Sequence, residues 1–156
     1  MPGEPQLPNT IFGVDASDVK VVDPQGIPSN LIIKKGDVFK LQSTLKFDGR
    51  LAPVLLCCIC WECCYCFDPC DYDPGGPEPK MKTFCSPKHC GYTNVFEYKD
   101  RANEVTVQSN QLDIAVYKLT AVFKFQWHCT CRNGPPIYRP PITAYADGPM
   151  IEIYEA

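Results

Sequence analysis

The sequence has no long basic run and no apolar segment that could cross a bilayer. Its longest run of Lys and Arg is Lys34-Lys35, and its formal net charge at pH 7 is −3. Proteins that bind nucleic acids or anionic lipids usually cluster their positive charges, and this chain does not. The longest apolar stretch, residues 51–61, is shorter than the roughly 20 residues that a membrane-spanning helix needs. We therefore expect neither nucleic-acid binding nor membrane insertion.

The features of a classical secretory protein are also missing. The start, Met1-Pro2-Gly3-Glu4-Pro5, has neither the basic region nor the apolar region of a signal peptide. The sequence contains no Asn-x-Ser/Thr acceptor for N-glycosylation. These absences predict a cytoplasmic protein. An extracellular location stays open, because cysteine-dense chains such as this one are usually extracellular and disulfide-bonded.

The common catalytic motifs are absent too. We find no phosphate-binding glycine loop, no serine nucleophile elbow and no metalloprotease helix. The two histidines each adjoin a cysteine, in His89-Cys90 and His128-Cys129. Adjacent residues of a strand point to opposite faces, so neither pair can hydrogen-bond as nucleophile and base. The sequence therefore predicts a protein that is not an enzyme.

Long uninterrupted helical segments are missing as well. Sixteen prolines and ten glycines are spread over the 156 residues, and β-branched and aromatic residues fill the intervals. The proline-rich residues 1–10 are expected to form an extended arm, and residues 11–156 a single domain. Strands are predicted at 11–14, 19–22, 37–47, 81–84, 94–98, 105–108, 117–127, 142–146 and 150–154, and from Leu51 into the cysteine-rich segment 57–90. Strands at this spacing predict an all-β fold built as a two-sheet sandwich.

One local motif bears on the type of sandwich. Asp113-Ile114-Ala115-Val116-Tyr117-Lys118-Leu119 resembles the tyrosine corner of immunoglobulin-like and fibronectin-III-like domains, although Ala115 replaces the usual glycine. In those domains the phenol hydrogen-bonds to nearby backbone just before the penultimate strand. The resemblance implies an immunoglobulin-like two-sheet sandwich and implies no particular function.

Against these absences, the sequence has eleven cysteines, and seven of them lie between Cys57 and Cys70. Side chains of a strand alternate between its faces. One face of this segment would be an apolar row suited to a core, the core row: Ile59, Trp61, Cys63, Tyr65 and Phe67. The other face would be an outer row of four thiols and a carboxylate: Cys58, Cys60, Glu62, Cys64 and Cys66. Neighbours within a row are about 6.5–7 Å apart, too far for a disulfide, so the outer thiols need partners elsewhere.

The remaining cysteines can supply those partners. Sulfurs on adjacent antiparallel strands can surround one tetrahedral zinc ion, and the proximity of His89 and His128 to cysteines favours a metal. The predicted metal ligands are Cys58, Cys60, Cys64, Cys66, Cys129 and Cys131, followed by Cys85 and Cys90. If these residues bind zinc, we expect the protein to be a non-enzymatic binding or assembly module with a zinc cofactor. Its predicted partner is another protein or a second copy of the chain, as a homo-oligomer.

Two alternatives stay open. The spacing Cys60-x-x-Cys63-x-x-Cys66-x-x-x-Cys70 is that of bacterial iron–sulfur ferredoxins and would indicate a redox carrier. However, Asp71 replaces the proline that normally follows the fourth cysteine, and the intervening residues are bulky. Disulfides could satisfy the same sulfurs in an extracellular structural or adhesive domain, where the odd number of cysteines leaves a thiol to link subunits.

Overall fold

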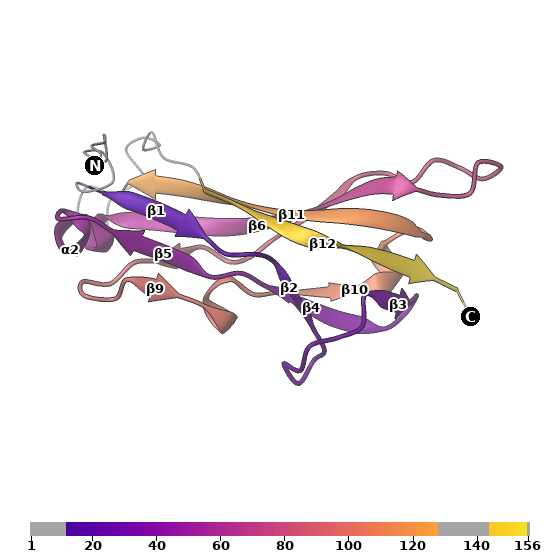
Figure 1. Ribbon diagram of the computed structural model, residues 1–156, viewed down its shortest axis with the longest axis horizontal. Coiled ribbons are helices and arrows are strands. Elements are labelled where there is room, and N and C mark those ends of the chain that lie inside the picture. Colours follow the sequence, from indigo (N-terminus) through magenta and orange to yellow (C-terminus); the bar gives the residue numbers. More distant parts are fainter. Residues whose placement is uncertain (1–11, 128–143, 156) are drawn as a thin grey trace, which may run out of the picture.

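The structure is a computed structural model that describes residues 12–127 and 144–155 (Figure 1). The predicted arm, residues 1–10, lies outside these ranges. Strands predominate among the described residues, so the predicted all-β class is confirmed. The strands are β1 (Gly13–Ala16), β2 (Lys20–Val22), β3 (Ile32–Lys34), β4 (Val38–Gln42), β5 (Leu45–Asp48), β6 (Ile59–Asp71), β7 (Lys82–Cys85), β8 (His89–Cys90), β9 (Glu97–Tyr98), β10 (Val105–Gln108), β11 (Ala115–Trp127) and β12 (Ala144–Tyr154). The helical elements are α2 (Ala52–Leu55), η1 (Leu56–Cys58), η2 (Asp100–Asn103) and η3 (Ser109–Gln111).

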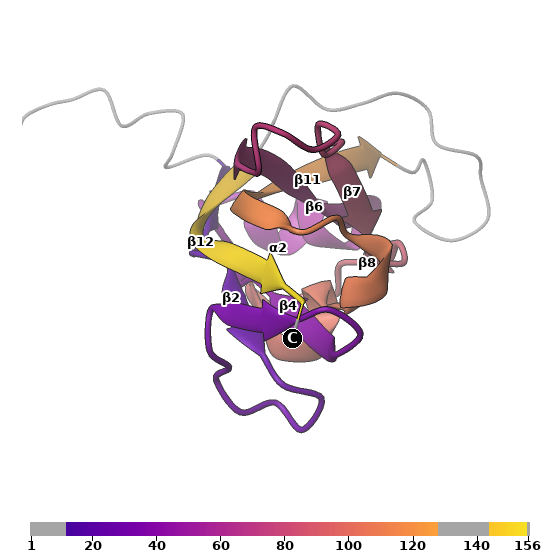
Figure 2. The same ribbon diagram turned by 90° about the vertical axis from the view of Figure 1, so that its right-hand side faces the viewer.

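The described strands form three sheets. The largest has the order β3-β12-β11-β6-β7, with β8 also paired to β6, and the two smaller ones have the orders β1-β5-β9 and β10-β4-β2. In Figure 1, β6, β11 and β12 lie on one side of the molecule, and β4, β5, β9 and β10 lie on the other. Figure 2 shows β6, β7 and β11 end on, again opposite β2 and β4. The large sheet therefore faces the smaller sheets across the interior.

Aromatic side chains fill the space between these sheets. Phe39 of β4 meets Phe67 of β6 with ring centroids 6.2 Å apart. Phe47 of β5 lies 5.4 Å from Trp61 of β6, and 6.2 Å from Phe125 of β11. Because contacts of this kind join strands of different sheets, the buried aromatics hold the layers together.

The motif at the start of β11 makes the hydrogen bond that its resemblance implies. The Tyr117 hydroxyl donates to the backbone carbonyl of Asp113 at 2.7 Å. The Tyr117 ring is fully buried. Burial is the main reason that the pKa of this phenol is raised to about 12, so the hydroxyl is a hydrogen-bond donor at neutral pH.

The segment 37–47 shows the predicted alternation but is not one strand. Phe39, Leu41, Ser43, Leu45 and Phe47 are all buried. The chain nevertheless leaves the β4 sheet after Gln42 and enters a different sheet as β5. A single inward-facing row can therefore serve two sheets that lie on the same side of the core.

The strand predicted from Leu51 is wrong for its first eight residues. Residues 52–58 form the short helices α2 and η1, and strand β6 begins only at Ile59. Pro53 lies in the first turn of α2, where its missing N–H costs no hydrogen bond. Cys58 consequently belongs to η1 and not to the extended outer row.

Two other strand boundaries differ from the prediction. The strand expected at 94–98 is reduced to β9, because Asn94 has a φ of 69°, a turn conformation. The two closing strands are one strand, β12, with a shift in its register against β11 between Lys118 and Thr120. A Cβ on Gly148 would lie 2.8 Å from the Leu119 Cβ, so this irregularity needs glycine.

The described helices include none with the length and apolar character of a transmembrane span.

Candidate functional site

Strand β6 positions the cysteine-rich segment in the middle of the large sheet. It pairs along its whole length with β11, from Ile59 opposite Trp127 to Asp71 opposite Val116. All five residues of the core row are at most 1% exposed. From Ile59 onward the core row is therefore buried as predicted; in the outer row Glu62 and Cys66 are partly exposed, whereas Cys60 and Cys64 are buried.

Two outer-row cysteines are paired with cysteines on neighbouring strands. Cys64 lies directly opposite Cys85 of β7, and the two form a disulfide with Cα atoms 4.0 Å apart. Cys60 lies directly opposite Cys90 of β8, and these also form a disulfide, with Cα atoms 4.1 Å apart. The bonded cysteines are 21 residues apart in the sequence for Cys64–Cys85 and 30 residues apart for Cys60–Cys90. The two disulfides therefore attach β7, β8 and the loop between them to β6.

Local hydrogen bonds fix the register that makes this pairing possible. The Asp73 carboxylate accepts a hydrogen bond from the Gly75 N–H at 3.0 Å and orders the turn between β6 and β7. Beyond β7, the Ser86 N–H donates to the Cys63 carbonyl at 2.8 Å, and the Cys63 N–H donates to the Ser86 hydroxyl at 2.9 Å. Ser86 thus extends the pairing past Cys85 and leads the chain toward β8.

A carboxylate completes a group of three ligand atoms on the outer face. An oxygen of Glu62 and the sulfurs of Cys64 and Cys85 all lie within 4.8 Å of one another. The Glu62 carboxylate is part-buried, and it makes no ion pair within residues 12–127 and 144–155. Glu62 also lines a cavity of about 110 Å³ with Lys88, Lys124, Phe125 and Gln126.

The other predicted metal ligands are not gathered with this group. Cys58 lies on η1 with its sulfur 3.8 Å from that of Cys57. Cys66 faces Thr83 on β7 and Thr120 on β11, so neither neighbouring strand offers it a sulfur. Cys129 and Cys131, with His128, lie outside the described residues. Cys60 and Cys90, and Cys64 and Cys85, come together as two separate pairs and not as one tetrahedral site.

The cysteines with ferredoxin-like spacing are also not gathered. Cys60, Cys63, Cys66 and Cys70 follow one another along the extended strand β6. Cys63 belongs to the core row, whereas Cys60 and Cys66 lie on the outer face. A strand rises about 3.3 Å per residue, so the first and last of these thiols are too far apart to bind one cluster.

The buried thiol of Cys63 is chemically quiet. Burial raises its pKa to about 12, despite a hydrogen bond with Tyr65 that lowers it. A thiol with this pKa is almost entirely protonated at neutral pH and is a poor nucleophile or metal ligand.

Behind the cysteines, a buried polar network centres on Asn103. Its side chain accepts a hydrogen bond from the Trp61 indole at 2.8 Å and donates to the carbonyls of Ser43 and Tyr98 at 3.1 and 3.0 Å. Its backbone carbonyl accepts the hydroxyl of Tyr65. The network ties the core row of β6 to the opposite sheets. Nothing in the sequence around Asn103 indicates this role.

His89 takes part in packing and not in a cluster of sulfurs. Its ring lies 5.1 Å from that of Trp61 and 5.5 Å from that of Tyr98, measured between centroids. Partial burial lowers the pKa of the imidazole below its ordinary value of 6.5. Within the described chain, the neighbouring Cys90 is bonded to Cys60 and is therefore not available to His89 as a nucleophile.

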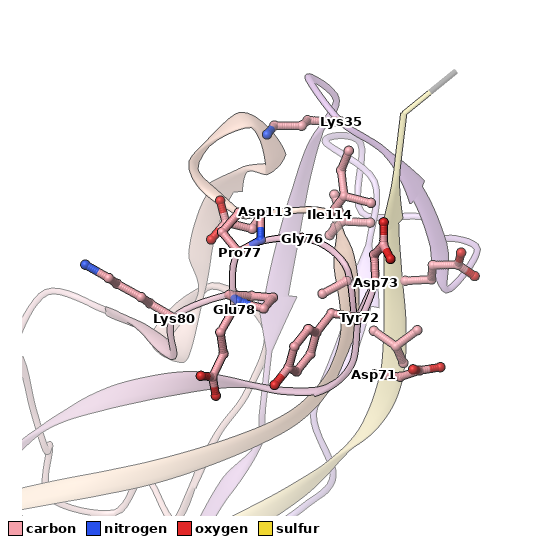
Figure 3. A pocket seen from close by; sticks show the side chains of 15 residues that line it. Lys35, Asp71, Tyr72, Asp73, Gly76, Pro77, Glu78, Lys80, Asp113 and Ile114 are labelled. Atoms are coloured by element: carbon pink, nitrogen blue, oxygen red, sulfur yellow. The ribbon is translucent and has the colours of Figure 1, made fainter.

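A large hollow on the described part of the surface lies away from the two bridges. It has a volume of about 720 Å³ and lies where β6 and β12 end and β11 begins. Figure 3 shows the carboxylates of Asp71, Asp73, Glu78 and Asp113 around it, together with Lys35 and Lys80. The described residues of its lining include no cysteine and no histidine. The thiol of Cys70, which precedes the lining residue Asp71, donates to the carbonyl of the lining residue Val116 at 3.4 Å.

The sequence contains a signal for one bridge that the alternation pattern alone does not use. Cys64 precedes Pro74 by as many residues as Cys85 follows Gly75. A hairpin centred on that Pro-Gly turn therefore places the two cysteines opposite each other.

Comparison of the chain with protein-family models, with curated proteins and with solved structures found no match.

Proposed function

We propose that this chain is a non-enzymatic structural or binding domain that works in an oxidising compartment with its cysteine-rich strand fastened by two disulfides. The observation that carries the proposal is the direct opposition of Cys60 to Cys90 and of Cys64 to Cys85 across neighbouring strands. Disulfides persist in oxidising environments and are rare in the cytosol. An extracellular or comparable location therefore agrees better with these pairs than a cytoplasmic one.

An immunoglobulin-like sandwich is the architecture that we propose for the domain. The Tyr117–Asp113 hydrogen bond supports it, as do the aromatic contacts between the large sheet and the sheets opposite it. Such sandwiches commonly serve as scaffolds for recognition and assembly. Cys90, which adjoins His89 in the chain, is bonded to Cys60, and this supports a role without catalysis.

The partner that we propose is a second copy of the chain. Cys70 is a free, exposed thiol near the end of β6. Past Phe67, the side of β6 that faces β7 has no strand partner within the described residues. A free backbone edge beside an exposed, unpaired thiol suits pairing with another copy followed by oxidation of the two Cys70 thiols to an inter-chain disulfide. Light scattering without reductant should give a dimer for the wild type and a monomer for Cys70→Ser; a monomeric wild type would remove this part of the proposal.

Intact mass tests the disulfide proposal directly. Without alkylation, protein produced in an oxidising compartment should be lighter by about 2 Da per bridge than its reduced form, with at least two bridges per chain. Alkylation of all eleven cysteines in that material would refute the proposal. The reduced protein, freed of reductant and alkylated while unfolded, serves as the control for complete alkylation.

A thiolate–zinc module is the second candidate, and one observation favours it. Glu62, Cys64 and Cys85 bring three ligand atoms to the same point of the outer face. Two of these atoms are the sulfurs of a disulfide in the structure. The two candidate functions therefore correspond to two oxidation states of the same pair of cysteines.

A further inference from the structure

We propose that reduction of the Cys64–Cys85 disulfide creates a zinc site made of these two thiolates and the carboxylate of Glu62. The proposal rests on the cysteine pairing of the proposed function and adds a ligand to it. Glu62 and Cys64 are neighbours in the outer row of β6, and Cys85 lies opposite Cys64 on β7. The sheet itself thus holds the three donors together.

The chemistry of the donors suits zinc. Zinc binds thiolates and carboxylates in tetrahedral sites. Zn–S bonds of about 2.3 Å place two sulfurs roughly 3.8 Å apart, so the S–S bond must break before the ion can enter. Three protein ligands leave the fourth position for water. Cys85 is exposed while Cys64 is buried, so the ion has access from one side.

The conversion balances in two steps. Two equivalents of a thiol reductant transfer two electrons and two protons to the disulfide, which yields the thiols of Cys64 and Cys85 and one oxidised reductant. Zn²⁺ then displaces the two thiol protons and binds both thiolates and the Glu62 carboxylate. The product retains one negative charge, and the cations that line the neighbouring cavity, Lys88 and Lys124, offset it.

The second bridge provides an internal control. Cys60 and Cys90 have the same cross-strand placement as Cys64 and Cys85. Among the described residues, no acidic side chain lies close to both the Cys60 and the Cys90 sulfur, as Glu62 does to the Cys64 and Cys85 sulfurs. The proposal therefore predicts that only one of the two reduced pairs binds zinc tightly.

The test uses the full chain, first oxidised and then reduced under nitrogen, with Zn²⁺ alone as the probe and a chromophoric chelator as competitor. Reduced wild type should take up one Zn²⁺ per chain at this site and the oxidised protein none. Cys60→Ser/Cys90→Ser should keep the site. Cys64→Ser/Cys85→Ser should lose it. Glu62→Gln should weaken binding by at least about tenfold, since even indirect partners of metal ligands cost about 10–100-fold.

Equal zinc binding by the reduced wild type and by Cys64→Ser/Cys85→Ser would overturn the proposal, and so would an unchanged affinity in Glu62→Gln. If reduction unfolds the chain, Zn²⁺ should restore the β-rich circular dichroism of the wild type and of Cys60→Ser/Cys90→Ser, but not that of Cys64→Ser/Cys85→Ser. A failure of zinc to do so also overturns it. The oxidised sample reports separately on the proposed function, because its mass shows whether the bridges form at all.

Discussion

Individual cysteines of β6 differ in reactivity because some of their thiols are buried in the core and others are exposed to solvent. Cys63 is fully buried, and its pKa is raised to about 12. Cys70, on the same strand, is exposed and free. In the native monomer, in which Cys70 is not linked to a second copy, we expect iodoacetamide at pH 8 to label Cys70 within minutes and to leave Cys63 unlabelled until the protein unfolds. Peptide mass spectrometry after timed quenching measures both; labelling of Cys63 at the rate of Cys70 would contradict its placement in the core.

Asn103 is a small buried side chain whose removal should strongly lower the free energy of unfolding. Its side chain serves Trp61, Ser43 and Tyr98 in the buried network. Asn103→Ala would leave these groups unsatisfied, and each buried unpaired group costs about 1–3 kcal/mol. We expect the free energy of unfolding in urea to fall by at least about 3 kcal/mol. The exposed Asn110→Ala is the matched control and should change it by less than about 0.5 kcal/mol; similar losses in both variants would argue against the network.

His89 should make stability depend on pH in the mildly acidic range. Its folded-state pKa lies below the ordinary 6.5 because of burial, so the unfolded chain binds more protons than the folded one as the pH falls through 6.5. Stability is therefore lost on acidification. Between pH 7 and pH 5 the wild type should lose more unfolding free energy than His89→Phe, which keeps an aromatic ring beside Trp61. Urea unfolding at both pH values gives the difference, and a larger loss in the variant would reverse the sign that burial predicts.

At the scale of elements, the two bridges attach the β7–β8 segment to the sheet. Closing loops of this length stabilises a protein by roughly 3–4 kcal/mol in the chain-entropy description. Cys60→Ser/Cys90→Ser and Cys64→Ser/Cys85→Ser should each lower the free energy of unfolding of the oxidised protein by about that amount. Cys70→Ser, which breaks no bridge, should leave it nearly unchanged.

Reductant separates this effect from a packing defect caused by serine. In excess dithiol the wild type should become as unstable as the bridge variants, and the difference between them should vanish. A stability gap that persists under reduction would mean that the cysteines stabilise the sheet as apolar side chains and not as disulfides.

Elements whose patterns come from side-chain alternation were predictable from the sequence. The core row of β6, the inward residues of 37–47 and the strand 105–108 all follow the two-residue period. The assignment of strands to sheets, and the choice between a short helix and a buried strand, were not predictable from the sequence. Periodicity does not reveal that β4 and β5 belong to different sheets, and an apolar segment such as 51–58 looks the same in a short helix as in a buried strand.

The candidate site was predictable as a face, and of its two pairs only Cys64–Cys85 has a signal in the sequence, the equal spacing of these cysteines about the Pro74-Gly75 turn. Alternation alone assigns Cys60 and Cys64 to the outer face of β6. Their partners depend on the register of β7 and β8, which is set by the turn at Pro74 and by the pairing of Ser86 with Cys63. Because register is a tertiary property, a one-residue slip would have turned the same cysteines away from each other.

For the whole molecule, the central claim is that the outer face of β6 is bridged to β7 by Cys64–Cys85 and to β8 by Cys60–Cys90. The backbone of the large sheet and the bridges support each other, because each bridge requires the register that the sheet provides. The proposed location, the link to a second copy and the zinc site all depend on which cysteines are paired.

Peptide mapping of the oxidised, unfolded protein at mildly acidic pH tests this claim most directly. Cleavage after Glu62 separates Cys60 from Cys64, and cleavage after Lys88 separates Cys85 from Cys90. We expect the peptide 83–88 to be linked to 63–80 through Cys64, and the peptide 89–97 to be linked to 47–62 through Cys60. The reverse linkage, or recovery of 83–88 and 89–97 as unlinked alkylated peptides, would contradict it.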